Sequence, residues 1–146
     1  MCGIVGIISS KEVTGRILNS LKKLEYRGYD SAGIATLVDG NINEVKCEGR
    51  VEVLEKDITK FNLKGDIGIG HVRWATHGKP SKINAHPHSS EEVSVVHNGI
   101  IENSTILKKL LEKKGYVFKS QTDTEVIAHL VTEYLKKNSL KDSIIT

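Results

Sequence analysis

MCGIVGIIS, residues 1–9, is the stretch on which the fold prediction depends. From Gly3 to Ser9 its residues are uncharged and mostly small or β-branched, which is typical of a buried β-strand at the start of a domain. Cys2 directly precedes this strand and directly follows the initiator methionine. We therefore expect a strand that begins beside a cysteine side chain.

Apolar spacing predicts how the chain continues. Apolar residues recur at helical intervals over 13–24, which predicts a helix of about four turns. Asp39-Gly40 suits the positive φ angles of a tight turn, so 34–38 and 42–47 are predicted to form a β-hairpin. Other patterns predict helices over 51–60, 104–114 and 122–137, strands over 67–72, 93–97 and 116–119, and the start of a helix at 139. Hairpins and separate helix blocks indicate an α+β fold with mainly antiparallel sheet.

Two polar loops interrupt this pattern. Gly28 and Gly33 break up a segment rich in tyrosine, arginine and aspartate, and residues 73–90 hold both prolines and three of the six histidines. Long loops without periodicity of their own are more often functional than not. Asn98-Gly99 is a strong turn signal and predicts that the strand over 93–97 turns back into 100–101.

Composition excludes several classes of protein. The chain has 146 residues, 38% hydrophobic and 27% charged, which fits a single globular domain. Its net charge of +3 comes from scattered or paired basic residues without interleaved aromatics, so we expect no nucleic-acid partner. No apolar stretch approaches the ~20 residues that cross a bilayer, so we expect no membrane partner. Two cysteines are too few for a disulfide framework, which favours a cytoplasmic location.

Cys2 is the residue with the clearest potential for chemistry. Removal of Met1 would leave one residue that carries both a thiol and a free α-amine. An α-amine has a pKa of about 7.7 to 8.0 and accepts a proton near neutral pH, so nucleophile and base can belong to the same residue. The alternative is that Met1 stays, or that Cys2 is simply a small buried residue.

The histidines suggest a metal site as a rival hypothesis. His86-Pro87-His88, with other histidines, contains enough imidazoles to bind zinc. The spacing is irregular, and no cysteine pair or Glu-x-x-His pattern supports it. We therefore predict neither a metal nor a cofactor. Metal binding, or thiol redox chemistry by Cys2 and Cys47, remains an alternative.

Five motifs carry a resemblance to a known family. They are MCGIVG (1–6), YRGYDSAG (26–33), HVRWATHG (71–78), VVHNGIIEN (95–103) and QTDTEVIAHL (121–130). Together they resemble the class II, N-terminal-nucleophile glutamine amidotransferases. Their amino-acid sequences are most similar to those of the glutaminase domains of the isomerising glutamine:fructose-6-phosphate aminotransferases. The resemblance implies a four-layer αββα sandwich, of which residues 1–146 would be the N-terminal part of one amidotransferase domain.

The resemblance also implies roles for individual residues. Cys2 would be the nucleophile, and Asn98 with Gly99 would form the oxyanion hole. Arg73 would bind the α-carboxylate of glutamine and Asp123 its α-ammonium group. For these last two the plain alternatives are a surface arginine and an acidic helix start, with Thr122 and Glu125 as a capping box.

The loop after the strand over 67–72 would close over the substrate. In the family this loop holds the residues that correspond to Thr76 and His77, while Trp74 is a candidate lid or gate, or simply a packing residue. Arg27 would support the site beside the N-terminus.

The expected partners follow from the same resemblance. They are glutamine and, in a second domain of the longer enzyme, fructose 6-phosphate; that domain would also form a homodimer. One alternative is an inactive glutamine-binding regulatory module. Another is the amidotransferase domain of a different class II enzyme, such as the purine-pathway phosphoribosyl transferase.

Overall fold

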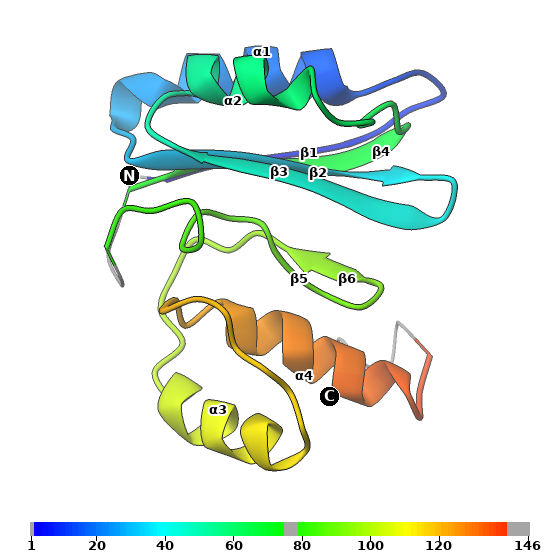
Figure 1. Ribbon diagram of the computed structural model, residues 1–146, viewed down its shortest axis with the longest axis vertical. Coiled ribbons are helices and arrows are strands. Elements are labelled where there is room, and N and C mark those ends of the chain that lie inside the picture. The colour runs from blue at the N-terminus through cyan, green and yellow to red at the C-terminus, as the bar shows by residue number, and fades with distance from the viewer. Residues whose placement is uncertain (1, 75–78, 140–146) are drawn as a thin grey trace.

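A computed structural model describes residues 2–74 and 79–139, and its elements stack in four layers (Figure 1). The first layer contains helices α1 (Thr14–Leu24) and α2 (Val51–Ile58). The second is a sheet in the order β1 (Gly3–Ile8), β4 (Ile67–Arg73), β2 (Ser31–Val38) and β3 (Asn41–Glu48). The third pairs β5 (His88–Ser90) with β6 (Val93–Val95), and the fourth contains α3 (Ser104–Lys113) and α4 (Glu125–Leu135). A short 3-10 turn, η1 (Glu25–Arg27), follows α1.

The layer order confirms the predicted αββα arrangement. Every strand pair in both sheets is antiparallel, which confirms the predicted α+β class. Asp39 and Gly40 have φ angles of 50° and 79°, as a tight two-residue hairpin turn requires, and the hairpin of β2 and β3 is also confirmed.

The main hydrophobic core lies between the first two layers. Ile17, Leu21 and Leu54 from the helices pack with Ile34 and Val72 from the sheet, and all of them are buried. Burial of an aliphatic side chain stabilises the fold by about 1.5 to 3 kcal/mol, so these contacts fix the helix layer on the sheet.

Glycines in β4 allow α1 to approach the sheet closely. A Cβ atom on Gly70 would lie 2.5 Å from Cγ2 of Ile17 and 3.0 Å from Cδ1 of Leu21. A Cβ on Gly68 would lie 2.8 Å from Cδ1 of Ile17. These glycines therefore set the distance between the first two layers.

The two faces of β4 have different surroundings, because successive side chains in a strand point to opposite faces. Val72 joins the core below the helices. His71 and Arg73 are also buried, but they point to the other face, toward the second sheet. The space between the two sheets is thus polar.

The strand over 3–9 is only partly as predicted. Val5 and Ile7 pack against the core, whereas Ile4 and Ile8 are 42% and 82% exposed. β1 is an edge strand with alternating exposure, because the helix layer covers only one of its faces. The predicted strand is therefore present, but the prediction that it is buried was wrong for its outward-facing residues.

Two strand predictions in the second half of the chain were also wrong. Asn98-Gly99 does not form a hairpin turn, since β6 pairs with β5 and with no other strand of the described ranges, through a turn in which Glu91 has a φ of 49°. β5 lies within the segment expected to be irregular. Residues 116–119 are not a strand, because the Glu125 carboxylate, instead of a neighbouring strand, accepts the N–H of Lys119.

The same carboxylate explains the late start of α4. Glu125 also accepts the N–H and the hydroxyl of Ser120, so residues 120–124 form a turn instead of the first helical turn expected from Thr122. The capping box of Thr122 and Glu125 is not formed. The helix expected from 139 lies, apart from its first residue, outside the described residues.

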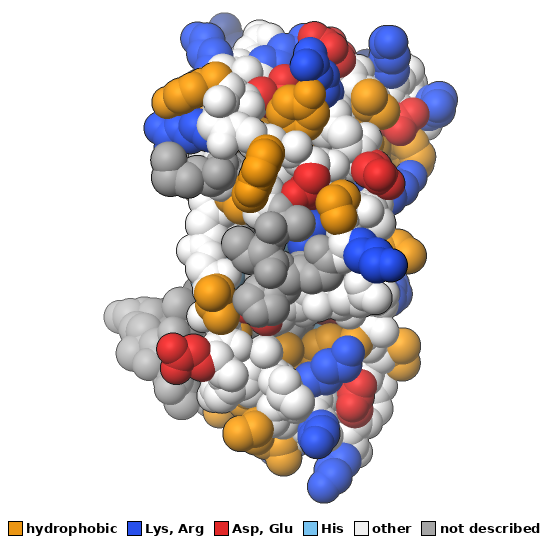
Figure 2. All heavy atoms as spheres, turned by 90° about the vertical axis from the view of Figure 1, so that its left-hand side faces the viewer, with side chains coloured by type: hydrophobic (Ala, Val, Ile, Leu, Met, Phe, Trp, Pro, Cys, Tyr) orange, Lys and Arg blue, Asp and Glu red, His pale blue; other side chains and the backbone are white. Residues whose placement is uncertain are grey.

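Acidic and basic side chains are interspersed on the face shown in Figure 2, and no continuous basic stripe crosses the described part of that face. None of the described helices has the length and apolar composition needed to span a bilayer.

Replacement of Gly70 by alanine should destabilise the protein by about 1 to 3 kcal/mol, because the new methyl group overpacks against α1. Gly15 in α1 has nothing within 4 Å of its virtual Cβ, so Gly15→Ala should stabilise by about 0.5 to 1 kcal/mol. Urea unfolding measures both changes. A Gly70→Ala protein as stable as the Gly15→Ala protein would contradict the close packing of α1 on β4.

Candidate active site

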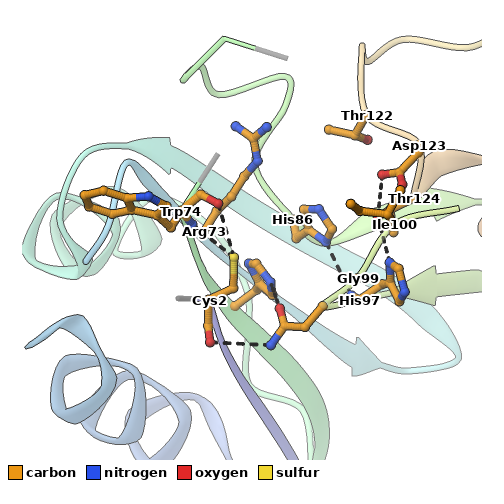
Figure 3. Close-up of a pocket in the computed structure, with 12 residues that line it drawn as sticks. Cys2, Arg73, Trp74, His86, His97, Gly99, Ile100, Thr122, Asp123 and Thr124 are labelled. Carbon is orange, nitrogen blue, oxygen red and sulfur yellow. Dashed lines mark hydrogen bonds between the residues drawn. The ribbon is translucent and has the colours of Figure 1, made fainter. Parts of the chain in front are cut away.

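A cavity of about 540 Å³ opens where the ends of β1 and β4 meet the second half of the chain (Figure 3). Its lining comprises Cys2, His71, Arg73, Trp74, His86, His97, Asn98, Gly99, Ile100, Thr122, Asp123 and Thr124. Six of the eight residues predicted for the site are in this set. The other two, Thr76 and His77, lie outside the described residues.

Cys2 is held by the main chain of Trp74. The pairing of β1 with β4 aligns Gly3 with Val72, which brings Cys2 beside the end of β4. The N–H of Trp74 donates to Sγ at 3.1 Å, and the thiol donates to the Trp74 carbonyl at 3.4 Å. The sulfur therefore lies in the cavity with backbone groups as its hydrogen-bond partners.

Asn98 and Gly99 lie next to Cys2. Nδ2 of Asn98 is 3.5 Å from the Cys2 carbonyl oxygen, and Oδ1 is 2.8 Å from Nε2 of His71. A Cβ atom on Gly99 would be 2.8 Å from Nε2 of His97, so the position requires glycine. An amide and a backbone N–H beside a nucleophile are the groups that can stabilise negative charge on an attacked carbonyl.

Arg73 is a fixed cation in the cavity wall. Its side chain is 4% exposed and its Nη1 is 3.4 Å from Oδ1 of Asp30. The hydroxyl of Ser31 donates to the same carboxylate oxygen at 2.8 Å, and the N–H of Asp30 donates to the Arg73 carbonyl. The alternative of a surface arginine is therefore wrong, and the buried guanidinium can meet an anion in the cavity.

Asp123 is a fixed anion in the same cavity. Its Oδ2 accepts the N–H of Ile101 at 2.6 Å, and α4 begins only at Glu125. The neighbouring residues are anchored to histidines, Thr122 to His88 at 2.9 Å and Thr124 to His97 at 3.3 Å. A cation and an anion in one cavity, as Figure 3 shows for Arg73 and Asp123, suit a zwitterion such as an amino acid.

Trp74 packs on the loop before β2. Its indole lies against Gly28, where a Cβ atom would be 2.3 Å from Cε3, and the side chain is 51% exposed. The packing alternative for Trp74 thus has direct support, and its role as a lid or gate stays a prediction. Arg27 lies over the Tyr26 ring at 5.4 Å from the centroid and is not part of the cavity lining.

The structure reveals a layer of buried histidines that sequence reasoning treated only as candidate metal ligands. His71 and His86 stack with their ring centroids 4.3 Å apart, and His88 meets His86 edge-on at 4.7 Å. Within the described ranges, no group of three or more His, Cys, Asp or Glu side chains is arranged to hold a metal ion. One sequence signal could have pointed to His71 as a residue of the site. Side chains two positions apart in a strand lie on the same face, which places His71 beside Arg73.

Burial keeps these histidines neutral. It lowers the pKa of His71 to about 4, against the opposing effect of the hydrogen bond to Asn98. Burial, together with the positive charge of Lys46, lowers the pKa of His88 to about 3. Burial also lowers the pKa of His86, and neighbouring histidines add to the shift. The site therefore contains uncharged hydrogen-bonding rings near neutral pH.

Comparison with protein families identifies the domain. A family model described as glutamine amidotransferase domain matches residues 71–143. The chain belongs to the glutamine amidotransferase domain family.

Curated relatives of this amidotransferase domain carry a more specific name. The proteins from Clostridium acetobutylicum and Francisella tularensis are both named glutamine–fructose-6-phosphate aminotransferase (isomerizing), and are 56% and 58% identical over 99% of this chain. The chain spans 24% of the length of each of these relatives.

Solved structures share the fold of the amidotransferase domain. The glutamine phosphoribosylpyrophosphate amidotransferase of B. subtilis, in complex with ADP and GMP, matches with a TM-score of 0.79 and 32% identity. The match covers 99% of this chain and 31% of that one. A structure described as the allosteric regulatory enzyme of purine biosynthesis matches with a TM-score of 0.78 and 34% identity, over 99% of this chain and 32% of that one.

Because these histidines are buried and neutral, we predict that acid destabilises the amidotransferase domain. Unfolded histidines take up protons below their ordinary pKa of 6.5, whereas His71 and His88 stay neutral in the fold down to about pH 4 and pH 3. The free energy of unfolding should therefore be constant above pH 6.5 and fall by about 1.4 kcal/mol per pH unit for each such histidine below it. Urea titrations from pH 7.5 to 4.5 measure this slope.

The His88→Gln variant provides the control for that slope. Glutamine can keep a hydrogen bond to Thr122 but does not titrate. Below pH 6.5 the free energy of unfolding of this variant should therefore fall less steeply than that of the wild type, by about 1.4 kcal/mol per pH unit. A wild-type stability that does not change between pH 7 and pH 5 would show that these rings are not held neutral.

Proposed function

We propose that this domain hydrolyses the side-chain amide of glutamine, with Cys2 as the nucleophile. One observation carries the proposal: Cys2 shares a single cavity with the donors of Asn98 and Gly99 and with the opposite charges of Arg73 and Asp123. The membership in the amidotransferase family supports the same reaction.

The reaction begins at the sulfur. With Met1 removed, the α-amine of Cys2 accepts the thiol proton through a water molecule, and the thiolate attacks the carboxamide carbon of glutamine. The carbonyl oxygen becomes an oxyanion, and Nδ2 of Asn98 and the N–H of Gly99 donate hydrogen bonds to it. Collapse of this intermediate breaks the C–N bond, and the protonated amine returns its proton to the leaving ammonia.

Water completes the cycle. The first half leaves a γ-glutamyl thioester on Sγ of Cys2. The α-amine then takes a proton from a water molecule, the resulting hydroxide attacks the thioester carbonyl, and the same donors stabilise the second oxyanion. Glutamate leaves, and the proton returns to the sulfur.

Arg73 and Asp123 hold the amino-acid end of glutamine in this proposal. A guanidinium binds the α-carboxylate with two parallel hydrogen bonds, and a carboxylate accepts from the α-ammonium group. Fixing both ends presents the carboxamide to sulfur in one pose. Thr76 and His77 are proposed to complete the substrate contacts, with Trp74 at the edge of the site.

We further propose that the ammonia serves an aminotransferase. The curated relatives at 54% to 58% identity carry the name glutamine–fructose-6-phosphate aminotransferase. The phosphoribosylpyrophosphate amidotransferase structure and the structure of the regulatory enzyme of purine biosynthesis are only 32% and 34% identical. This difference favours fructose 6-phosphate as the acceptor, bound outside residues 1–146. The homodimer and the cytoplasmic location expected from the sequence stay predictions.

The two cysteines provide a matched test in the full-length protein. Cys2→Ala should lower glutamine hydrolysis by at least about 10³-fold, because it removes the nucleophile. Cys47→Ala should leave hydrolysis unchanged, since Cys47 is 3% exposed in the helix-side core. Arg73→Lys should act mainly on KM, because a lysine cannot form the bidentate contact.

Ammonia release in a coupled assay gives the rates, and intact mass analysis shows whether Met1 is absent. An active Cys2→Ala protein would refute the proposal. So would full activity in protein that retains Met1.

A further inference from the structure

The Asn98 side chain has two ends of nearly the same shape. Nδ2 donates hydrogen bonds, whereas Oδ1 only accepts them, and a half-turn about the last bond exchanges the two. Only one orientation serves an oxyanion hole, because Oδ1 would repel the developing charge. Asn98 is exposed in the cavity, so solvent alone would not select that orientation.

His71 contacts the accepting end of this amide. Its Nε2 lies 2.8 Å from Oδ1 of Asn98, and since Oδ1 carries no proton, Nε2 must donate. Nδ1 of the same ring is buried and makes no hydrogen bond of normal geometry within the described residues, and the main chain of His97 lies near the ring. A neutral imidazole carries one proton, and the contact with Oδ1 of Asn98 assigns that proton to Nε2. The contacts therefore select the Nε2-protonated ring.

The ring itself is held firmly. His71 lies in β4, is 1% exposed and stacks on His86 at an interplanar angle of 17°. His86 in turn accepts the N–H of His97 on Nδ1 at 3.4 Å. By comparison, the contact from Nδ2 of Asn98 to the Cys2 carbonyl is 3.5 Å long. The shorter and more buried of the two contacts on the Asn98 amide is the one with His71.

We propose that His71 is a positioning residue that fixes the Asn98 amide with Nδ2 toward Cys2, an inference that rests on the proposed oxyanion role of Asn98. His71 acts through Asn98 and not on glutamine. Because burial lowers the pKa of His71 to about 4, the ring is neutral at working pH and has one proton to place. A neutral ring with its proton on Nε2 is a donor of fixed direction.

Two variants of the full-length protein separate the hydrogen bond that His71 donates to Asn98 from the space that the His71 side chain fills. His71→Leu removes the donor and leaves a buried side chain of similar size. It should lower kcat for glutamine hydrolysis by about 10- to 100-fold, approaching the loss of one oxyanion donor, while KM stays within about 3-fold. His71→Gln offers an amide N–H at a similar reach and should stay within about 5-fold of the wild-type kcat.

The rate at which iodoacetamide alkylates Cys2 distinguishes a positioning role from a structural one. If His71 only supported the fold, its loss would slow this alkylation as well as glutamine hydrolysis. The sulfur displaces iodide from a saturated carbon, so no oxyanion forms. The alkylation rate of His71→Leu should equal that of the wild type although its kcat has fallen. Equal losses in both rates, a wild-type kcat in His71→Leu, or a His71→Gln protein as slow as His71→Leu would each overturn the proposal.

The tautomer can be checked without any variant. Histidine-selective ¹⁵N labelling of the wild-type protein should show the Nε2 of His71 protonated and Nδ1 unprotonated at neutral pH. A proton on Nδ1 would overturn the inference even if the variants did not fold. Asn98→Ala, measured in parallel, separates the two levels: full activity there refutes the oxyanion role itself, whereas an inactive Asn98→Ala beside an unimpaired His71→Leu refutes only the role of His71.

Discussion

The antiparallel pairing of β1 with β4 is the constraint on which the site depends. Gly3 pairs with Val72, so the residue before β1 meets the residues after β4, and the Trp74 main chain reaches the sulfur of Cys2. The glycines of β4 let α1 close over this pair, and α1 buries the core that holds the two strands in register. A shift of one residue would turn His71 and Arg73 into that core and Val72 into the cavity.

The second constraint is the polar layer between the sheets. Buried polar groups are tolerated where they are hydrogen-bonded, and this layer satisfies most of its members by linking histidines to Asn98, Thr122 and Thr124. These links fix the segments that carry the proposed oxyanion donors and the Asp123 carboxylate. The histidines thus connect the fold of the second half of the chain to the geometry of the site without carrying charge.

Local signals predicted local structure well. The Asp39-Gly40 hairpin and the helices over 14–24 and 104–113 follow from turn chemistry and apolar spacing, which act between near neighbours. The strand prediction over 116–119 failed because the Glu125 carboxylate, six residues along the chain, accepts the N–H of Lys119, and apolar alternation does not reveal such a side-chain contact. Asn98-Gly99 failed as a hairpin for a related reason, since its asparagine bonds to His71 and Cys2 instead of completing a ladder.

The site was predictable only in part. The family resemblance named Cys2, Arg73, Asn98, Gly99 and Asp123, and the fold brings them to one cavity, but their roles stay predictions. The contribution of His71 depends on a contact between residues 27 positions apart and could not be read from the sequence. The pairing of Arg73 with Asp30, over 43 positions, is equally a product of the fold.

Covalent trapping of the nucleophile tests the central claim most directly. A glutamine analogue with a diazoketone in place of the carboxamide would be incubated with the native full-length protein, and the adduct located by peptide mass spectrometry. The account predicts one adduct, on Cys2, that excess glutamine prevents. Cys47 should stay unmodified, because burial raises the pKa of its thiol to about 11. An adduct on any other residue, or labelling of Cys2 that glutamine does not suppress, would contradict the account.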